Sequence, residues 1–545
     1  MHKIVTVEEM RLLEANADAA GVSYAQMMEM AGAALADVVQ TRLTNIEDVL
    51  VVVLTGPGNN GGDGLVAGRL LAEAGATVKF YFLQPPDEDD PNVQLARAAG
   101  LFMADAENDQ RWRVLKNMLR GVDVLIDALF GTGVRLPLSA TASKLLKQAG
   151  KSISAAEKAP LRVAVDVPSG FNSDTGEIDQ SVLHADMTIT FGAAKIGQFR
   201  FAGADVLGEL VLAEIGWPAK LDGLADIALD LADDSSVSAL LPPRPRNAHK
   251  GTFGTALVIA GSVNYTGAAF LAAKSAYLGG AGLVTVGIPM GLHGAIAAQL
   301  PEATWVILPS DMGVIADGAV SIARKATAKA AALLLGPGWG TEKSTLAFLR
   351  GLLSGASEKP STEFGFQPSG EEASPSAAEN SGSLPPLVMD ADGLKLLAQI
   401  EDWPGRVPPE TILTPHPGEM AILTDLPKDD VQADRVGFAQ RFAAEWGHIV
   451  VLKGAFTIVA APDGRTTMQP FATSALARAG TGDVLAGLIV GLLAQGMEAF
   501  EAAVAGTYIH GLAGELAADQ IGTTASVLAG DVMEFIPKAL VALKG

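Results

Sequence analysis

The chain of 545 residues repeats one pattern many times: a short apolar run, a glycine-rich turn and a helical stretch. In the first half the apolar runs occupy residues 48–54, 77–83, 122–127 and 161–166, and the last two each end in Asp. These runs lack polar alternation, which is typical of strands buried on both faces of a sheet. Strands that alternate with helices predict parallel βαβ units, so we expect a doubly wound α/β sheet.

The alternation breaks between residues 214 and 247, where Trp217-Pro218 is followed by Leu241-Pro-Pro-Arg-Pro-Arg246. This composition is typical of a connection between domains. Because a second α/β series begins at residue 255, we expect two α/β domains, residues 1–218 and 219–545. Residues 354–386 interrupt the second domain, and Ser, Pro and Gly supply 17 of these 33 residues. We therefore expect a flexible surface insertion there.

The composition excludes several classes of function. Acidic residues outnumber basic ones by 61 to 39, giving a formal net charge of −22, which repels polyphosphate backbones and argues against nucleic acid as a partner. The absence of cysteine excludes disulfides, zinc–thiolate sites, iron–sulfur clusters and cysteine nucleophiles. Glycine and proline interrupt the longest uncharged stretch, residues 275–301, and the first residues lack the apolar core of a signal peptide. We therefore expect a cytoplasmic protein without membrane spans.

Three polar segments follow predicted strands of the first domain. Thr55-Gly-Pro-Gly-Asn-Asn-Gly-Gly-Asp-Gly64 fits the GxGxxG spacing of a phosphate loop at a helix N-terminus, although Asp63 would place a carboxylate beside pyrophosphate. Asp127 and Asp166 end two further strands, and Ser169 follows the second. Because ligands bind outside the carboxyl ends of parallel strands, we expect one shared site; a structural glycine turn and helix-capping aspartates are the alternatives. The oxygen-rich side chains suit a hard cation: Asn60, Asp127 and Ser169.

A second candidate site lies in the second domain. Ala479-Gly480-Thr481-Gly482-Asp483 precedes the apolar helical stretch 484–494. Backbone amides at a helix N-terminus can bind an anion, and an Asp one turn into the helix can act as a base. Lys453-Gly-Ala-Phe-Thr457 closes an earlier strand, and His416 is held between two prolines, although a purely structural histidine is an alternative there.

The motifs of the two halves resemble two known families. GPGNNGGDG, DALFGTG, DVPSG and Phe191-Gly-Ala-Ala-Lys195 resemble the NAD(P)H-hydrate epimerase family. His249-Lys-Gly-Thr-Phe-Gly254, Gly261-Ser-Val-Asn-Tyr-Thr-Gly-Ala-Ala269, Gly336-Pro-Gly338, TPHPGE, KGAFT and AGTGD resemble the ADP/ATP-dependent NAD(P)H-hydrate dehydratase family. Their order is that of the bifunctional NAD(P)H-hydrate repair family, and the resemblance covers nearly the whole chain except residues 354–386. It implies a Rossmann-like first domain and a ribokinase-like second domain.

For the first domain the resemblance implies interconversion of the R and S hydrates of NADH and NADPH (NADHX and NADPHX). It implies a potassium ion held by Asn60, Asp127 and Ser169, and Asp166 as the catalytic acid/base, with Lys195 as a second catalytic candidate. The residues implied to bind the substrate are Asn59, Asn60, Gly61, Gly62, Asp63, Gly131, Thr132, Gly133, Val134, Arg135, Leu136, Pro137 and Asp166.

For the second domain the resemblance implies ADP-dependent dehydration of the S hydrate, with Mg²⁺ and with Asp483 as the base. The residues implied to line the hydrate site are Ala268, Gly338, His416 and Asp483. Those implied to hold the nucleotide are Lys453, Gly454, Ala455, Phe456, Thr457 and Gly482.

The partners implied by the resemblance are small molecules and further copies of the chain, as a homo-oligomer. A rival hypothesis makes the second domain a vitamin-type kinase of the same fold, with a non-catalytic nucleotide-binding module before it. An NAD-dependent dehydrogenase, suggested by GxGxxG alone, would need a hydride-accepting substrate pocket that the sequence does not indicate.

Overall fold

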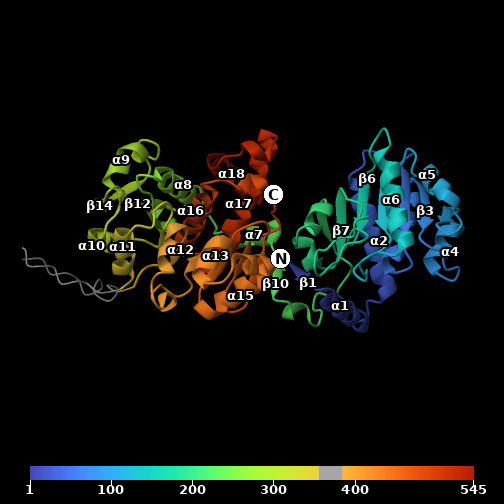
Figure 1. Cartoon of the computed structure of the whole chain (residues 1–545), viewed down its shortest axis with the longest axis horizontal. Helices are drawn as coiled ribbons and strands as arrows, with labels where there is room; N and C mark the ends of the chain where they lie inside the picture. Colours follow the sequence, from blue (N-terminus) through green and yellow to red (C-terminus); the bar gives the residue numbers. More distant parts are fainter. Residues whose placement is uncertain (355–382, 545) are drawn as a thin grey trace, which may run out of the picture. The chain divides into compact units, whose positions relative to one another are not determined.

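The computed structural model describes residues 1–354 and 383–544. The insertion expected at 354–386 therefore lies almost entirely outside the described residues. The chain folds into two compact units: one is His2–Leu229, and the other is Met1 together with Asp230–Gly545. The short strand β10 (Leu229–Leu231) lies at the boundary between them in sequence. Figure 1 shows the helices and strands of both units.

The first unit contains a sheet of seven parallel strands (Figure 1), which confirms the predicted doubly wound architecture. The chain passes outward from the centre in both directions, so the order reverses between β2 and β5, the point at which such sheets bind ligands. In sheet order the strands are β4 (Phe102–Asp105), β3 (Thr77–Phe82), β2 (Leu50–Thr55), β5 (Val124–Ala128), β6 (Leu161–Val165), β7 (Met187–Phe191) and β9 (Glu209–Ala213).

Helices cover both faces of this sheet because its strands are apolar on both sides. Val51 and Val53 of β2 pack into a cluster with helices α2 and α3, whereas Val52 and Leu54 pack into another with α5 and α6. A separate parallel pair joins β1 (His2–Val5) to β8 (Ala194–Lys195). The helices are α1 (Val7–Ala19), α2 (Tyr24–Thr41), α3 (Asn59–Glu73), α4 (Pro91–Ala98), α5 (Arg113–Met118) and α6 (Ala140–Ser154).

The sequence predicts a helical stretch from Leu65 to Ala74, whereas helix α3 begins at Asn59, six residues earlier. The polar segment 59–63 is therefore the first turn of a helix, where the first backbone amides have no acceptor within the helix. Glycine makes this possible, because a Cβ at Gly61 would lie 2.0 Å from the carbonyl oxygen of Gly56, and one at Gly64 would lie 2.5 Å from the Cβ of Ala128. The glycines thus let the helix approach the strand ends closely.

The second unit is built on a larger sheet, parallel from β13 to β19 and continued by two antiparallel strands. This is the ribokinase-like α/β domain that was predicted. In sheet order its strands are β13 (Thr304–Leu308), β12 (Leu283–Pro289), β11 (Thr255–Ile259), β16 (Ala332–Leu335), β17 (Leu387–Met389), β18 (Ile412–Leu413), β19 (Ile449–Leu452), β20 (Ile458–Ala460) and β21 (Thr466–Met468). A hairpin joins β14 (Ser310–Asp311) to β15 (Val314–Ile315).

Helix α16 (Thr481–Ala494) is buried along nearly its whole length, which explains its apolar sequence. It packs closely on α8 (Thr266–Leu278), because a Cβ at Gly487 or Gly491 would lie within 2.4 Å of a backbone carbonyl oxygen of α8. The other helices are α7 (Asp234–Leu240), α9 (Met290–Ala297), α10 (Val320–Thr327), α11 (Lys343–Leu353), α12 (Asp392–Leu397), α13 (Pro417–Thr424), α14 (Lys428–Ala433), α15 (Arg435–Trp446), α17 (Ala499–Ile521) and α18 (Ala529–Ala542).

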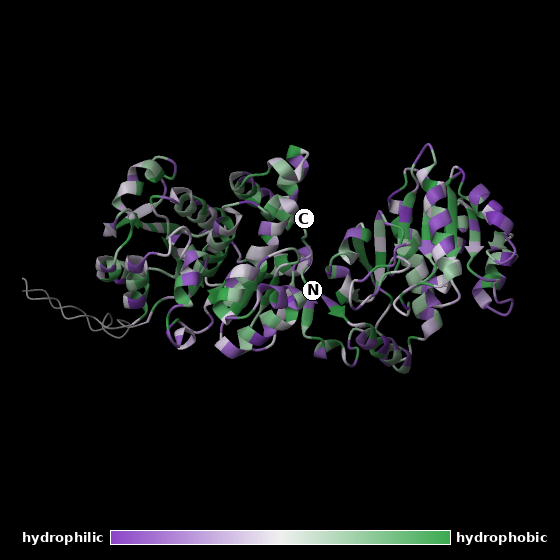
Figure 2. Cartoon of the chain, viewed as in Figure 1, coloured by the Kyte–Doolittle hydropathy of each residue, from purple (hydrophilic) through white to green (hydrophobic). Residues whose placement is uncertain are grey.

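Apolar residues gather on the strands and on the helix faces that cover them, while the hydrophilic residues lie on the outer faces (Figure 2). Among the residues that the structure describes, no helix combines the length and the hydropathy needed to cross a bilayer.

Candidate active sites

Asp166 and Lys195 form a buried ion pair at the carboxyl edge of the first sheet. Asp166 follows β6 directly, with a φ of 63°, a conformation that non-glycine residues adopt mainly where the fold requires it. Its Oδ1 accepts hydrogen bonds from Lys195 Nζ and, at 3.0 Å, from Thr190 Oγ1. Lys195 also donates to Thr190 Oγ1 at 2.9 Å and to the Phe191 carbonyl at 3.1 Å, so all three ammonium protons are used. Asp166 Oδ2 accepts no hydrogen bond from the described residues.

Two further carboxyl groups lie within electrostatic reach of this pair. Burial raises the pKa of Asp63 well above its ordinary value, and the nearby charges of Asp166 and Glu14 raise it further. Burial also raises the pKa of Glu14, on helix α1. The structure thus brings Asp63, Asp166 and Lys195 together, as the sequence predicted, and adds Glu14 from a distant segment. Carboxyl groups whose pKa values are raised in this way are candidates for proton transfer.

Asp127, Ser169 and Asn60 meet beside this cluster. Ser169 donates to Asp127 twice, from Oγ at 2.6 Å and from its backbone amide at 2.9 Å, and Ser169 Oγ accepts from the Phe130 amide at 2.9 Å. A Cβ on the next residue, Gly131, would lie 3.0 Å from Asn60 Oδ1, so Asn60 adjoins the same loop. The buried Nδ2 of Asn60 has no partner among the described residues. The three side chains offer an oxygen-rich set suited to a hard cation such as potassium.

The predicted loop from Gly131 to Pro137 follows β5 and lies next to Asn60 at its first residue. At its other end it borders a cavity of about 750 Å³, whose lining also includes Lys147 and Phe201. Asp166 does not line this cavity. The loop therefore connects the carboxylate cluster to a space large enough for part of a nucleotide-sized ligand.

In the second unit, Ala268 and Gly338 lie in direct contact. A Cβ at Gly338, whose φ is 64°, would lie 2.7 Å from the Cβ of Ala268 and 2.8 Å from that of Tyr265. Gly338 follows β16, and Ala268 lies in the first turn of α8. Two residues that are 70 positions apart in sequence thus form one wall at the carboxyl edge of the second sheet.

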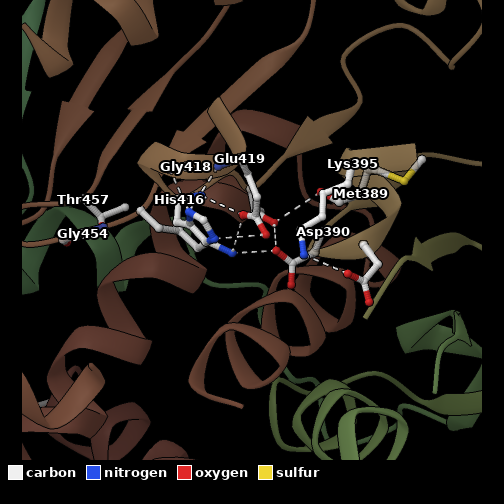
Figure 3. A network of polar contacts seen from close by, with 11 residues as sticks. Met389, Asp390, Lys395, His416, Gly418, Glu419, Gly454 and Thr457 are labelled. Atoms are coloured by element: carbon white, nitrogen blue, oxygen red, sulfur yellow. Dashed lines mark hydrogen bonds and ion pairs between the residues drawn. The ribbon is translucent and has the colours of Figure 1, made fainter. Parts of the chain in front are cut away.

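Lys453 is the centre of a charged network at the same edge. Figure 3 shows two carboxylates of this network, Asp390 and Glu419. Its Nζ lies 2.7 Å from Asp390 Oδ1 and 3.7 Å from Glu419 Oε2, and both carboxylates are buried. Burial lowers the pKa of Lys453, but the two carboxylates outweigh it and raise that pKa overall. Thr414 Oγ1 donates to Asp390 Oδ1 at 2.7 Å, which fixes the carboxylate between β17 and β18.

The side chain of His416 caps the N-terminus of α13 by accepting hydrogen bonds from backbone amides of the first turn. Its Nδ1 accepts hydrogen bonds from the amides of Gly418 and Glu419, at 2.9 and 3.2 Å (Figure 3). Nδ1 therefore carries no proton, so the neutral ring is protonated at Nε2, which lies 3.5 Å from Glu419 Oε1. Burial lowers the pKa of His416, which favours this neutral form. The ring is 54 % exposed and presents Nε2–H as a hydrogen-bond donor.

Asp483 lies in the first turn of α16. Burial, followed by the negative charge of Asp390, raises its pKa to about 7. No hydrogen bond from the described residues reaches its carboxylate. A Cβ at the preceding residue, Gly482, would lie 3.5 Å from Lys453 Nζ, so the predicted nucleotide residues Lys453 and Gly482 adjoin. A carboxylate with a pKa near the working pH and no internal partner is poised to accept a proton.

Two helices that begin in these sites lack a side-chain cap. The N-cap residues are Gly58 for α3 and Gly480 for α16, and neither offers a side-chain acceptor to the first amides. By contrast, the N-cap residues of α1 and α2 bind those amides with their own side chains. Uncapped amides are available to an external acceptor, so each site has a helix N-terminus able to bind an anion.

Sequence reasoning missed several side chains that the fold adds. Asp390 follows β17 in the same way that Asp127 and Asp166 end their strands, so the rule used for the first domain identifies it as well. Glu419 lies within the TPHPGE motif, but the sequence reasoning assigned it no role. For Glu14 no local pattern exists, because it reaches the site from helix α1 only through tertiary packing. In residues 1–354 and 383–544, no three carboxylate, imidazole or thiol side chains cluster closely enough to hold a metal ion by themselves.

Comparison with known families places both halves of the chain. Residues 24–197 match the family of the YjeF-related protein N-terminus, and residues 256–358 and 368–538 match NAD(P)H-hydrate dehydratase. One solved relative is the ADP/ATP-dependent NAD(P)H-hydrate dehydratase from Bacillus subtilis, co-crystallised with ATP and Mg²⁺. It is 29% identical with a TM-score of 0.46, and the match covers 58% of this chain and 98% of that one.

Relatives of the same overall organisation span the whole chain. The bifunctional NAD(P)H-hydrate repair enzyme of Thermofilum pendens is 34% identical, over 99% of this chain and 97% of its own length. That of Moorella thermoacetica is 33% identical, over 94% of this chain and 92% of its own length. The chain therefore belongs to the family of bifunctional NAD(P)H-hydrate repair enzymes.

Proposed function

We propose that the chain repairs hydrated NADH and NADPH in two steps: the first unit interconverts the R and S hydrates, and the second dehydrates the S hydrate with ADP. Family membership over both halves supports the pairing of activities. The observation that carries the proposal is that each unit holds one carboxylate free to meet a ligand, Asp166 Oδ2 in the first and Asp483 in the second.

In the first site, Asp166 acts as the acid/base for interchange of the hydroxyl configuration at C6 of the hydrate. Lys195 and Thr190 bind only its Oδ1, which leaves Oδ2 for the substrate. Because the protons of Lys195 are all bonded internally, Lys195 serves to orient Asp166 and to place a positive charge beside it. The uncapped first turn of α3 binds the negatively charged part of the substrate, and Asp63 lies there beside Asp166.

Potassium fits the oxygen atoms of Asn60, Asp127 and Ser169, and Gly131 leaves room beside the Asn60 carbonyl. The bound ion would supply positive charge beside the substrate in a cluster that is otherwise rich in carboxyl groups. Within this assignment, the Asn60 side chain would bind the ion through Oδ1, while its buried Nδ2 has no partner among the described residues.

In the second site, Asp483 accepts the proton of the hydrate hydroxyl. The hydroxyl oxygen of the hydrate attacks the terminal phosphorus of ADP at the same time. A P–O bond forms to the hydrate, and the bond to AMP breaks. The C–O bond then breaks with release of phosphate, assisted by the lone pair of the ring nitrogen, and loss of a ring proton regenerates NADH or NADPH. The uncapped amides at the start of α16 and the charge of Lys453 stabilise the transferring group.

The remaining assignments follow this geometry. Ala268 and Gly338 form the wall against which the hydrate packs, and His416 donates from Nε2. The segment from Lys453 to Thr457, together with Gly482, holds the nucleotide. Mg²⁺ would enter with the phosphates of ADP and neutralise their charge, because the described side chains form no complete metal site. The homo-oligomer implied by the family resemblance and the cytoplasmic location expected from the sequence both stay predictions.

The decisive experiment incubates the purified chain with mixed R and S hydrates, with and without ADP and Mg²⁺, and follows absorbance near 340 nm. The wild type is expected to convert the whole mixture, and only with ADP. Asp166→Asn is expected to stop after the S fraction, and Asp483→Asn to give no NADH while still equilibrating the epimers. Accumulation of a stable phosphorylated product would instead support the kinase hypothesis, and full conversion by Asp166→Asn would refute its catalytic role.

A further inference from the structure

The guanidinium group of Arg435 lies against the predicted nucleotide loop, the segment Lys453–Thr457. Arg435 is the first residue of α15, and its side chain donates to the Ala455 carbonyl and, at 3.1 Å, to the Leu452 carbonyl. Gly454, whose φ is 146°, lies directly against it, because a Cβ there would be 2.9 Å from a guanidinium nitrogen. The loop is thus folded around this side chain.

This position is unfavourable for a positive charge. Burial lowers the pKa of Arg435 to about 10, and its buried Nε has no partner among the described residues. No carboxylate among the described residues forms an ion pair with Arg435. The neighbouring Asp434 instead caps the same helix by accepting a hydrogen bond from the Gly437 amide. The start of a helix also disfavours a cation, because the helix dipole is positive there. A buried guanidinium that no carboxylate neutralises costs stability, and a ligand of opposite charge would offset this cost.

The hydrogen bonds of the loop leave one backbone donor without an acceptor among the described residues. The Lys453 amide donates to the Pro415 carbonyl at 2.9 Å, and the Phe456 amide donates to the Phe471 carbonyl at 2.8 Å. Thr457 Oγ1 accepts from the Gly454 amide at 3.3 Å and donates to the Gly454 carbonyl at 2.9 Å. The Ala455 amide donates to no group within the described residues. The loop therefore combines an unpaired amide with a guanidinium that has no counter-charge.

We propose that Arg435 is a positioning residue of the nucleotide site. It fixes the loop by holding the carbonyls of Leu452 and Ala455, and its charge is neutralised by the phosphate groups of a nucleoside diphosphate. This inference rests on the proposed ADP dependence, which assigns the nucleotide to the same loop. It adds a residue that lies outside every motif identified in the sequence and predicts that phosphate, rather than the base, is what Arg435 recognises.

The test compares Arg435→Met and Arg435→Lys with wild type in the full-length chain, by titration calorimetry with adenosine, AMP and ADP. Arg435→Met is expected to weaken ADP binding by about 10- to 100-fold, the range for a lost charge-assisted hydrogen bond. The loss is expected to be smaller for AMP and absent for adenosine. In steady-state assays the KM for ADP rises, whereas the KM for the hydrate and the epimerisation rate stay unchanged. Arg441→Met is the matched control, because Arg441 lies on the same helix and is 64% exposed.

The outcomes separate the inference from the function on which it rests. If the wild type binds no ADP, the proposed ADP dependence fails. If wild type binds ADP and Arg435→Met binds it equally well, the role of Arg435 is overturned. Equal losses for adenosine and ADP would reduce Arg435 to a structural support and overturn its charge role. If Arg435→Met does not fold, Arg435→Lys decides: it keeps the charge and is expected to retain tighter binding of ADP than of AMP, and equal affinities would contradict the proposal.

Discussion

Asp483 makes the fold of the second unit sensitive to pH in a way that can be measured. Its pKa is raised from an ordinary 3.8 to about 7, by burial first and by the negative charge of Asp390 second. At 1.36 kcal/mol per pH unit, ionising this group in the folded chain costs about 4 kcal/mol. The cost is absent below the unfolded pKa, where both states are protonated, and it grows until pH passes the folded pKa of about 7. Neutralising the side chain should therefore stabilise the protein at alkaline pH.

The perturbation is Asp483→Asn, which is nearly isosteric and carries no charge. Relative to wild type, its stabilisation should be about 2 kcal/mol larger at pH 8 than at pH 5.5. The raised pKa of Asp483 lowers the unfolding free energy of the wild type by roughly 2 kcal/mol at the lower pH and by about 4 kcal/mol at the higher. The assay is urea unfolding at both pH values. It follows the unfolding transition whose midpoint shifts when ADP is added, which identifies the second unit. Asp519→Asn is the control, because Asp519 is exposed near the end of α17.

A stabilisation that is the same at both pH values, or a destabilisation at pH 8, would refute the reasoning. Activity gives an independent check, because the base must be ionised to accept a proton. In the wild type, kcat/KM for the S hydrate should therefore fall below pH 7 along a single ionisation.

Three further predictions test the geometry of the sites. Gly61→Ala should abolish epimerisation and destabilise the first unit by about 1–3 kcal/mol or more, because the new Cβ would lie 2.0 Å from a backbone oxygen. Gly58→Ala, whose Cβ meets nothing within 4 Å, is its control, and equal melting temperatures for the two variants would contradict this account. Gly338→Ala should raise the KM for the hydrate at least tenfold in dehydration assays. Gly447→Ala is its control, because Gly447 also has a positive φ but an added Cβ there meets no atom within 4 Å, so the KM should not change. A normal KM for Gly338→Ala would contradict the assignment of Gly338 to the hydrate wall. Lys195→Met should lower the free energy of unfolding by about 3–5 kcal/mol, because it leaves the buried Asp166 carboxylate without its ion-pair partner. It should also stop epimer exchange, while dehydration of the S hydrate continues. A stable variant that still exchanges the epimers would show that the ion pair is dispensable.

The sequence alone was sufficient for the architecture, because hydrophobic runs and turns report local burial directly. Runs such as residues 48–54 identified strands covered on both faces, and the glycine-rich turns after them identified the edge where ligands bind. Asp127, Asp166 and Ser169 could be assigned to one site for the same reason, since parallel strands place their carboxyl ends together. The start of α3 was misplaced because glycine and asparagine favour a turn locally, whereas packing against β2 and β5 holds them in a helix.

Which charges face one another depends on the folded chain. Asp390 and Lys453 follow two different strands and Glu419 lies in the first turn of α13. Their mutual distances of a few ångströms determine which carboxylates are neutralised. Asp483 has no hydrogen-bond partner for its carboxylate among the described residues. Its raised pKa depends on burial, a property of the packed interior rather than of its neighbours in sequence. Arg435 is likewise ordinary in sequence and becomes unusual only when folded against the nucleotide loop. The residue pattern determines where a site can form, because strand ends and helix starts are local features. The electrostatics of that site depend on long-range contacts and desolvation, which no local pattern records.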